Sequence, residues 1–307
     1  MDHEHYERGR ANMDQAIRYH DCAMQALERD DFYSAQEHFQ KALKRTPSYQ
    51  TYNNLGYFYL SEGRTDENGC VKCADAVGMR YLKKALAIKS TAITSRSLGY
   101  FLYQKRAYQE ACEFFSLSYS IKQDDSVLYD LAAAQYMARN EAVLSTLAPL
   151  RREGSTEAME LYLFAVLRFA PEELSAVLER EKNWERLLDP PEIMELRYYT
   201  GKYEAIRAEV SMLLSGWSLW KEQWAMLIDA FLSCDAEEEL ACLMREHFEA
   251  YDETPASKKE MRDLRLMLRN ERMRKRCIEA YEYVPFIFPF CGYFGCSKHD
   301  QPWDGIE

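Results

Sequence analysis

Apolar residues recur at helical spacing along most of the chain. Between residues 16 and 48, two such stripes follow one another: Tyr19, Cys22, Ala23 and Ala26, then Ala35, Phe39 and Ala42. Because positions three and four apart share one face of an α-helix, each stripe predicts a helix with one buried side. Asp30 and Asp31 interrupt the pattern between the stripes, and Pro47 follows the second. The segment therefore predicts two helices joined by a turn.

The same arrangement recurs further along the chain. The phrase Leu-Gly-Tyr-Phe begins at Leu55 and again at Leu98, each time within an apolar helical run. Small residues keep the same spacing, so that the step from Ala23 to Ala35 equals the step from Gly99 to Ala111. A pattern that returns after tens of residues predicts a solenoid, in which each repeat packs on its neighbours.

Over residues 16–123 these repeats resemble the tetratricopeptide repeat, in which a Leu-Gly pair, a Tyr, and then Ala, Phe, Ala and Pro stand at set offsets. The matching residues of the second and third repeats are Tyr52, Leu55, Gly56, Tyr59, Leu82 and Ala85, then Leu98, Gly99, Leu102, Ala111, Phe115 and Ser118. Cys22 and Ala23 replace the Leu-Gly pair in the first repeat. The resemblance implies an all-α fold, a right-handed α-solenoid of helical hairpins.

Composition and spacing divide the chain into four parts. We expect an N-terminal lead-in over 1–15, three repeats over 16–123, degenerate helical repeats over 124–282, and an extended tail over 283–307. Additional residues separate the two helices of the second repeat, which predicts an insertion at about 63–77. A basic helix over 257–281 should end the array.

The tail is apolar and aromatic at its start, where Pro285 and Pro289 exclude a regular helix. An apolar segment of this kind is expected to be covered by other parts of the protein. We expect it to pack over the last hairpins as a cap. The alternative is that it runs back along the groove of the repeats as an internal ligand.

In tetratricopeptide repeats the first helix of each hairpin lines the concave groove, through its second, fifth and ninth positions. Carried over residue by residue, these are Ile17, His20, Met24, Gln50, Asn53, Tyr57, Ile93, Arg96 and Tyr100. The predicted peptide-binding groove comprises His20, Met24, Asn53, Asn54, Tyr57, Arg96, Tyr100 and Tyr103. Asparagine can bond a peptide backbone and arginine can pair with a carboxylate, so a peptide is the expected ligand. Capture of a C-terminal carboxylate is the narrower alternative, and packing between helices is the alternative for the tyrosines.

The sequence contains none of the motifs G-x-x-x-x-G-K-[ST], H-E-x-x-H, G-x-G-x-x-G or G-x-S-x-G. We therefore predict a non-catalytic scaffold or adaptor for a protein or peptide partner, and no enzyme. A peptide-sensing regulator is one alternative, although no helix-turn-helix segment precedes the repeats.

Nine cysteines are present, most of them single within helical patterns. Cys70 and Cys73 lie in the insertion, and Cys291 and Cys296 lie in the tail. Four thiols can hold zinc, so a zinc- or thiol-dependent protein centred on these residues is the alternative from another class. The default expectation is reduced thiols without a cofactor, as in a cytoplasmic protein.

The net charge of −11 argues against binding to nucleic acid or to an anionic membrane surface. Residues 258–276 are basic, but they follow an acidic stretch at 235–253, so we expect two solvated helix faces that compensate each other. No apolar run is long enough to span a membrane, and no secretory signal is present. The pattern favours a cytoplasmic protein and leaves its oligomeric state open.

Overall fold

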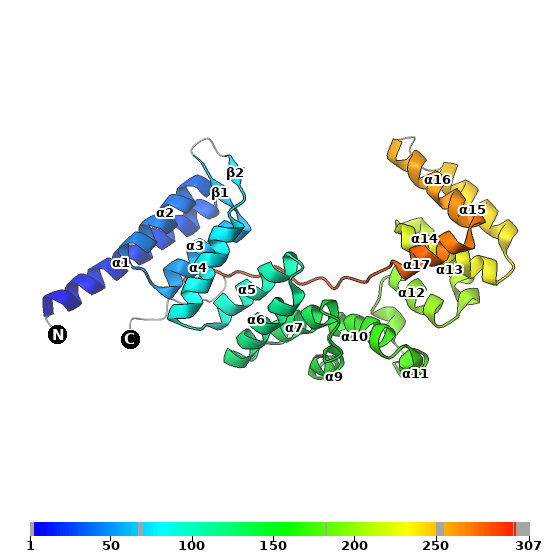
Figure 1. Cartoon of the computed structure of the whole chain (residues 1–307), viewed down its shortest axis with the longest axis horizontal. Coiled ribbons are helices and arrows are strands. Elements are labelled where there is room, and N and C mark those ends of the chain that lie inside the picture. Colours follow the sequence, from blue (N-terminus) through cyan, green and yellow to red (C-terminus); the bar gives the residue numbers. More distant parts are fainter. Residues whose placement is uncertain (1–2, 67–69, 182, 250–254, 297, 299–307) are drawn as a thin grey trace. The chain divides into compact units, whose positions relative to one another are not determined.

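The computed structural model describes residues 3–66, 70–181, 183–249, 255–296 and 298. These residues form helical hairpins in an α-solenoid, as the sequence predicted (Figure 1). The chain divides into two compact units. The first comprises Met1–Ala148 and Phe286–Glu307, and the second comprises Pro149–Pro285.

The first unit is built from successive helices that pair as hairpins. They are α1 (His3–Leu27), α2 (Phe32–Arg45), α3 (Tyr49–Ser61), α4 (Asp75–Ile88), α5 (Ala92–Gln104), α6 (Tyr108–Ile121), α7 (Asp125–Met137) and α8 (Val143–Thr146). The short helix α9 (Ala148–Arg152) begins at the end of this unit. Of the lead-in predicted over 1–15, residues 3–15 belong to the first helix, and residues 1 and 2 lie outside the described part of the chain.

Small residues allow the two helices of a hairpin to approach closely. Ala23 and Ala35 are fully buried, in α1 and α2 respectively. A Cβ atom on Gly99 would lie 2.7 Å from the ring of Phe115 in α6. A Cβ atom on Gly56 would lie 3.0 Å from the backbone oxygen of Gly78 in α4. The glycines of the repeated phrase therefore lie where the paired helices touch.

The insertion in the second repeat forms a small antiparallel hairpin between α3 and α4. Its strands are β1 (Arg64–Thr65) and β2 (Val71–Lys72), with Arg64 opposite Lys72 and Thr65 opposite Val71. The two helices on either side keep the packing of an ordinary repeat. The additional residues are thus accommodated at the edge of the hairpin.

The second unit is also helical. It comprises α10 (Thr156–Phe169), η1 (Pro171–Glu173), α11 (Leu174–Arg180), η2 (Trp184–Arg186), α12 (Pro190–Tyr199), α13 (Tyr203–Gly216), α14 (Lys221–Ser233), α15 (Glu237–Glu249), α16 (Pro255–Arg269) and α17 (Glu271–Glu279). The single basic helix predicted over 257–281 is wrong, because Asn270 separates α16 from α17. Its side chain accepts a 3.1 Å hydrogen bond from the backbone N–H of Met273 and so begins a new helix.

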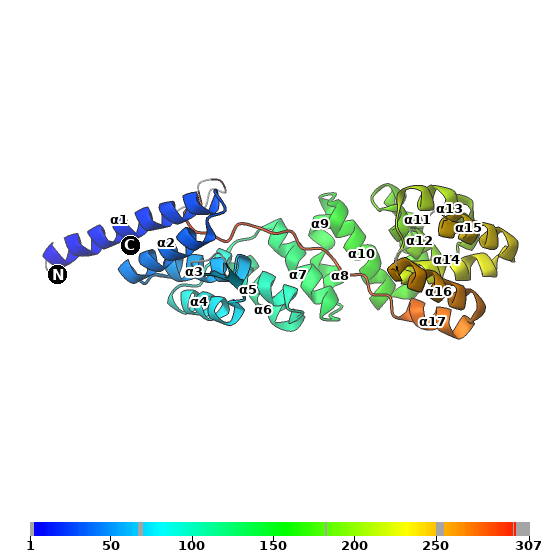
Figure 2. The ribbon, with the colours of Figure 1, turned by 90° about the horizontal axis from the view of Figure 1, so that it is seen from above.

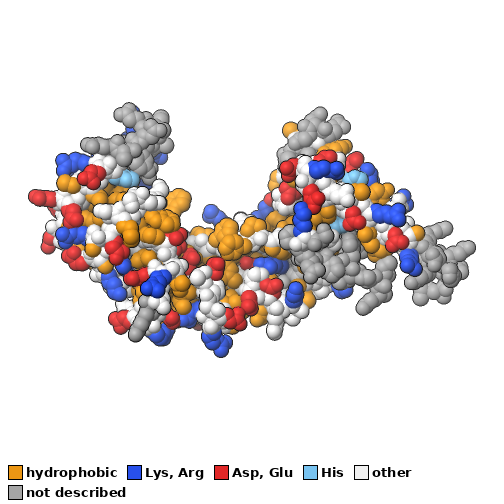
Figure 3. Space-filling view, turned by 180° about the vertical axis from the view of Figure 1, so that it is seen from behind, with side chains coloured by type: hydrophobic (Ala, Val, Ile, Leu, Met, Phe, Trp, Pro, Cys, Tyr) orange, Lys and Arg blue, Asp and Glu red, His pale blue; other side chains and the backbone are white. Residues whose placement is uncertain are grey.

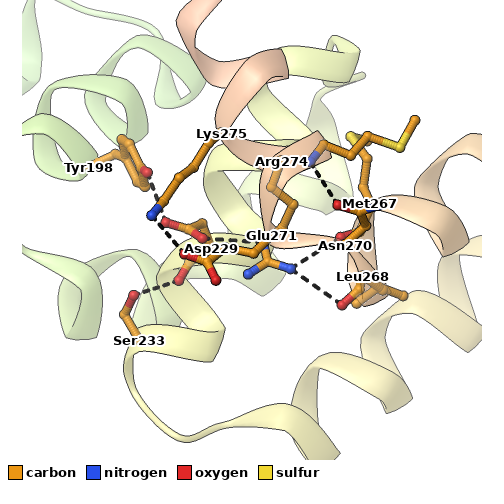
Figure 4. Close-up of polar contacts among 10 residues, drawn as sticks. Tyr198, Asp229, Ser233, Met267, Leu268, Asn270, Glu271, Arg274 and Lys275 are labelled. Carbon is orange, nitrogen blue, oxygen red and sulfur yellow. Dashed lines mark hydrogen bonds and ion pairs between the residues drawn. The ribbon is translucent and has the colours of Figure 1, made fainter.

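One residue of the basic stretch has a structural role in the second unit. The guanidinium of Arg274 in α17 donates to Asp229 of α14 and to the carbonyls of Met267 and Leu268 at the end of α16 (Figure 4). Asp229 also accepts a 2.9 Å hydrogen bond from the hydroxyl of Tyr198. Arg274 therefore satisfies helix-end carbonyls and ties three helices together.

The tail follows α17 as an extended chain, as its prolines predicted. Within the second unit, the ring of Tyr283 stacks on Phe164 with a centroid separation of 4.0 Å. Residues 286–296 of the tail belong to the first unit, where they lie beside α3 and α5 (Figures 1 and 2). Of the tail predicted over 283–307, residues 297 and 299–307 lie outside the described part of the chain. The expectation that the tail caps the last hairpins is therefore wrong, and the alternative position along the first repeats is the one observed.

Candidate peptide-binding groove

The tail is held in the first unit through its backbone. The side-chain amide of Asn53 donates a 2.7 Å hydrogen bond to the carbonyl of Gly292. Asn54 donates a 3.0 Å bond to the carbonyl of Phe294 and accepts a 2.9 Å bond from the N–H of the same residue. The hydroxyl of Tyr57 donates a 2.5 Å bond to the carbonyl of Phe290. Three polar side chains of α3 therefore bind alternate residues of one extended segment.

The two asparagines are oriented by their neighbours. The hydroxyl of Thr94 in α5 donates a 3.0 Å bond to the side-chain oxygen of Asn53, which directs the NH2 group toward the tail. That NH2 group also donates a 3.2 Å bond to the side-chain oxygen of Asn54. Both asparagines are at most 1% exposed. Since buried amides need hydrogen-bond partners, the tail supplies partners to the two amides that lie beneath it.

The ring of Phe290 occupies a cage of aromatic and cationic groups. It makes edge contacts with Tyr57 and Tyr100, at centroid separations of 6.2 and 5.9 Å. The guanidinium of Arg96 lies over its face, 4.4 Å from the ring centre. The arrangement combines apolar burial with a cation–π contact.

Tyr293 occupies a second, deeper position. Its ring stacks on Phe39 of α2 at 5.5 Å and meets the edge of Tyr57 at 4.8 Å. Its hydroxyl lies 3.5 Å from that of Ser61. Burial raises the pKa of Tyr293 well above the ordinary value for tyrosine, so the phenol stays neutral.

Gly292 lies between Phe290 and Tyr293 in the sequence and packs directly against Tyr57 and Ser97. A Cβ atom at this position would lie 2.3 Å from the ring of Tyr57 and 2.8 Å from the hydroxyl of Ser97. Real side chains do not approach so closely, so any other residue at 292 would force the segment away from α3 and α5. The groove therefore selects for glycine at this point.

Arg96 is fixed from behind by an acidic residue of α7. Its guanidinium donates to Asp130 at 2.9 Å from Nε and 2.8 Å from Nη2. The Asp130 side chain is 3% exposed, and its burial raises the pKa of the carboxyl to about 6 although Arg96 lowers it. The ion pair therefore positions the guanidinium over Phe290 and supplies the positive charge that lowers the pKa of Asp130.

The far end of the described tail lies near α1. Lys298 forms a 2.8 Å ion pair with Glu28. A pocket of about 780 Å³ opens between the tail and the first hairpin, lined by residues that include Met24, Cys291, Tyr293 and Cys296. Met24 thus lies at the edge of the tail's binding surface.

Two residues of the predicted groove pack within the repeats. His20 is buried 5.9 Å from the ring of Phe39, and burial lowers its pKa to about 4. The ring of Tyr103 makes an edge contact with Tyr108 at the start of α6. Of the predicted residues, Asn53, Asn54, Tyr57, Arg96 and Tyr100 contact the tail directly. That these residues bind a separate partner remains a prediction.

Sequence reasoning missed four residues of this site: Phe39, Thr94, Ser97 and Asp130. Phe39 carries the pattern of a residue between helix layers, so only its contact with Tyr293 reveals the second role. Thr94 precedes the fifth position of its helix by two residues and faces the neighbouring repeat. No periodic signal distinguishes such a residue from ordinary packing.

The four cysteines proposed as zinc ligands are not arranged as a metal site. Cys70 and Cys73 are exposed near the β-hairpin, whereas Cys291 and Cys296 lie in the tail against the repeats. Among the residues that the structure describes, no group of three or more His, Cys, Asp or Glu side chains could hold a metal ion. The shared site required all four sulfurs within a few ångströms, and that prediction is wrong for this structure.

The charged side chains of the surface are mixed in sign, and the acidic and basic stretches form ion pairs with other helices. On the face shown in Figure 3, acidic and basic side chains are interspersed, with hydrophobic groups between them. Glu239 of the acidic stretch pairs with Arg207, and Asp263 of the basic stretch pairs with Lys221. None of the helices in the described part of the chain combines the length and apolarity needed to cross a bilayer.

Comparisons with solved structures agree with the helical-repeat architecture. A tetratricopeptide repeat protein from Parabacteroides merdae superposes with a TM-score of 0.54 at 12% identity, covering 84% of this chain and 100% of the other. PilF of Pseudomonas aeruginosa matches at 0.45 and 15% identity over 83% of this chain and 99% of its own. Yeast Tom70 matches at 0.42 and 12% identity over 89% and 58%. The sequence matches no family model and no curated protein at a significant level. The match to the Parabacteroides merdae protein shows that the chain has the tetratricopeptide-repeat fold, as the repeated residues implied.

Proposed function

We propose that this chain is a non-catalytic scaffold whose first unit binds an extended segment of a partner protein, and that its own tail is the resident occupant of that groove. The main support for this proposal is the row of hydrogen bonds from Asn53, Asn54 and Tyr57 to alternate residues of the tail. These bonds recognise peptide backbone, so another extended segment can make them as well. The groove is thus suited to an extended peptide, and the sequence of the tail indicates which residues such a peptide would carry.

The tail also indicates the kind of partner segment. An aromatic side chain fits beside Arg96 and Tyr100, a glycine is required two residues later, and a second aromatic fits against Phe39. A partner would therefore carry an aromatic residue, any residue, glycine and a further aromatic residue in that order. The narrower expectation of carboxylate capture has less support, because Arg96 is already paired with Asp130.

The resident tail makes partner binding competitive. A segment tethered to the same chain has an effective concentration on the order of millimolar, so a free peptide must overcome that advantage. A partner segment can then bind only when the tail leaves the groove. This exchange favours the regulator among the earlier alternatives, since the tail would report whether the groove is occupied. The nine cysteines, most of them single within helical patterns, fit the cytoplasmic location that we propose.

The test uses a variant that ends at residue 285 and a synthetic peptide of residues 286–298. Calorimetric titration should give binding to the shortened variant, and at least about tenfold weaker binding to the full chain, because the tail competes. The matched control is the same peptide with Gly292→Ala, which should not bind. Far-ultraviolet circular dichroism and thermal unfolding check that the variant is folded.

Two results would contradict the proposal. One is a folded, shortened variant that does not bind the wild-type peptide. The other is equal binding of the glycine and alanine peptides, which would show that the groove contacts are not the ones used. Aggregation of the shortened variant would be resolved by the full chain carrying Gly292→Ala, which should bind the wild-type peptide more tightly than the unmodified full chain.

A further inference from the structure

The groove-bound part of the tail contains two cysteines whose thiols meet. Cys291 follows Phe290, and Cys296 follows a turn in which Gly295 adopts a positive φ of 76°. The thiols are hydrogen-bonded to each other, and both side chains line the pocket beside α1. Between them lie Gly292, Tyr293 and Phe294, the residues held by the groove.

When the tail binds in the groove, the same loop conformation brings the sulfurs of Cys291 and Cys296 together. The turn at Gly295 folds the chain back, and the hydrogen bonds from Asn53 and Asn54 keep it there. A covalent bond between the sulfurs would favour the docked shape of this loop by removing undocked conformations. By the same linkage, docking would favour formation of the bond.

We propose that Cys291 and Cys296 form a reversible dithiol–disulfide pair, oxidised by small-molecule disulfides, that locks the tail in the groove. Reduction then allows the tail to leave. Control of partner binding by this pair rests on the function proposed above, whereas formation of the bond does not. The exposed pair Cys70 and Cys73 lies outside this arrangement and does not participate.

The reaction is ordinary thiol–disulfide exchange. One cysteine, as the thiolate, attacks a sulfur of the small disulfide, forms a mixed disulfide and releases one small thiolate. The second cysteine, as the thiolate, attacks the protein sulfur of the mixed disulfide and releases the second small thiolate. Two electrons pass from the protein thiols to the small disulfide, and the two protons of the protein thiols end on the small thiols.

The experiment equilibrates the full chain carrying Cys70→Ser and Cys73→Ser in mixtures of reduced and oxidised glutathione. Remaining thiols are alkylated, and peptide mass spectrometry maps any disulfide. We expect a Cys291–Cys296 bond whose fraction rises with the oxidised share of glutathione. In the same samples, hydrogen exchange of the Phe294 amide should slow by roughly tenfold or more on oxidation. A Cys291→Ser, Cys296→Ser variant should show no redox dependence.

Two results would overturn the proposal. The first is alkylation of both cysteines as free thiols in the most oxidised mixture. The second is a mapped disulfide with unchanged exchange at Phe294, which would show that the bond does not stabilise docking. Neither readout needs an outside peptide, so a failure here is distinguishable from a failure of the proposed peptide-binding function.

Discussion

The side-chain amide of Asn53 donates a 2.7 Å hydrogen bond to the carbonyl of Gly292, which lies 239 positions later in the chain. The bond joins the inner helix of the second repeat to the C-terminal tail. Its donor is fixed by Thr94, and its acceptor lies where only glycine fits. Asn53 in the repeat and Gly292 in the tail are therefore complementary in hydrogen bonding and in shape.

Replacing Asn54 by Ala should release the tail while the helices stay folded. The substitution removes two hydrogen bonds to Phe294 and leaves the backbone groups of that residue unpaired. We expect docking to weaken by about 1–3 kcal/mol, measured by hydrogen exchange of the tail. Gln109→Ala, on the exposed side of α6, is the control and should leave exchange unchanged. Equal protection in both variants would remove Asn54 from the site.

Replacing Gly292 by Ala should displace the tail by a steric route. The new Cβ atom would lie 2.3 Å from the Tyr57 ring, which the packing around it holds in place. Limited proteolysis should then cut the tail at least about tenfold faster, as expected when docking loses roughly 1.4 kcal/mol or more. Gly216→Ala is the matched control, since nothing lies within 4 Å of a Cβ atom there. Unchanged proteolysis of the 292 variant would contradict the glycine requirement.

Replacing Gly99 by Leu tests the repeat packing itself. A Cβ atom at this position meets the Phe115 ring at 2.7 Å, so a larger side chain overpacks the α5–α6 contact. We expect the free energy of unfolding to fall by about 1–3 kcal/mol in a denaturant titration. Phe115→Leu in the same chain should recover part of that loss by making room. A single variant as stable as the wild type would mean that the helices can separate freely.

Replacing Arg96 by Ala should cost stability as well as peptide affinity, because Asp130 would lose its partner. Arg96 both lies over the ring of Phe290 and pairs with the buried carboxylate of Asp130. Breaking one side of a buried pair costs about 3–5 kcal/mol at neutral pH. The double variant Arg96→Ala, Asp130→Asn should regain much of it, as read from thermal unfolding.

That cost should also depend on pH. Burial raises the pKa of Asp130 to about 6 in the folded chain, above its unfolded value. The stability that this group contributes is present at low pH and is lost as the pH rises through about 6. Without Arg96 the loss should be larger, so Arg96→Ala should be nearly tolerated at pH 4 and severe at pH 8. A pH-independent loss would assign the effect of Arg96 to packing alone.

The second unit should lose stability as the pH rises from about 4.5 to 8. Burial raises the pKa of Glu195 to about 7 and that of Glu192 to about 8. Each is protonated in the folded unit at a pH where the unfolded chain has lost the proton, so stability falls from about pH 4.5 to 8. Glu195 accepts hydrogen bonds from Gln223 and Tyr281. Glu195→Gln should flatten the profile of thermal unfolding against pH, whereas the exposed Glu238→Gln should not.

The sequence by itself determined the hairpins. Periodic apolar stripes place one face of each helix against its neighbour, and small residues such as Ala23 and Gly99 decide where the paired helices touch. These contacts join residues close in the chain, so a local pattern encodes them. The same local logic missed the helix break at Asn270, because a single capping residue outweighed a continuous basic stretch.

Only the tertiary structure decided where the tail lies and which groove residues meet it. Two prolines exclude a helix at 283–290, but the hydrophobic effect has no direction and does not say which surface the segment covers. That choice depends on groups that come together only after the repeats have stacked: the amide of Asn53, the cage around Phe290 and the space opposite Tyr57. His20 holds the same position in its repeat as Asn53 and Arg96, yet it packs inside the hairpin, and so does Tyr103. Periodicity marks the side of a helix, whereas a specific hydrogen bond across the chain requires the three-dimensional arrangement of both partners.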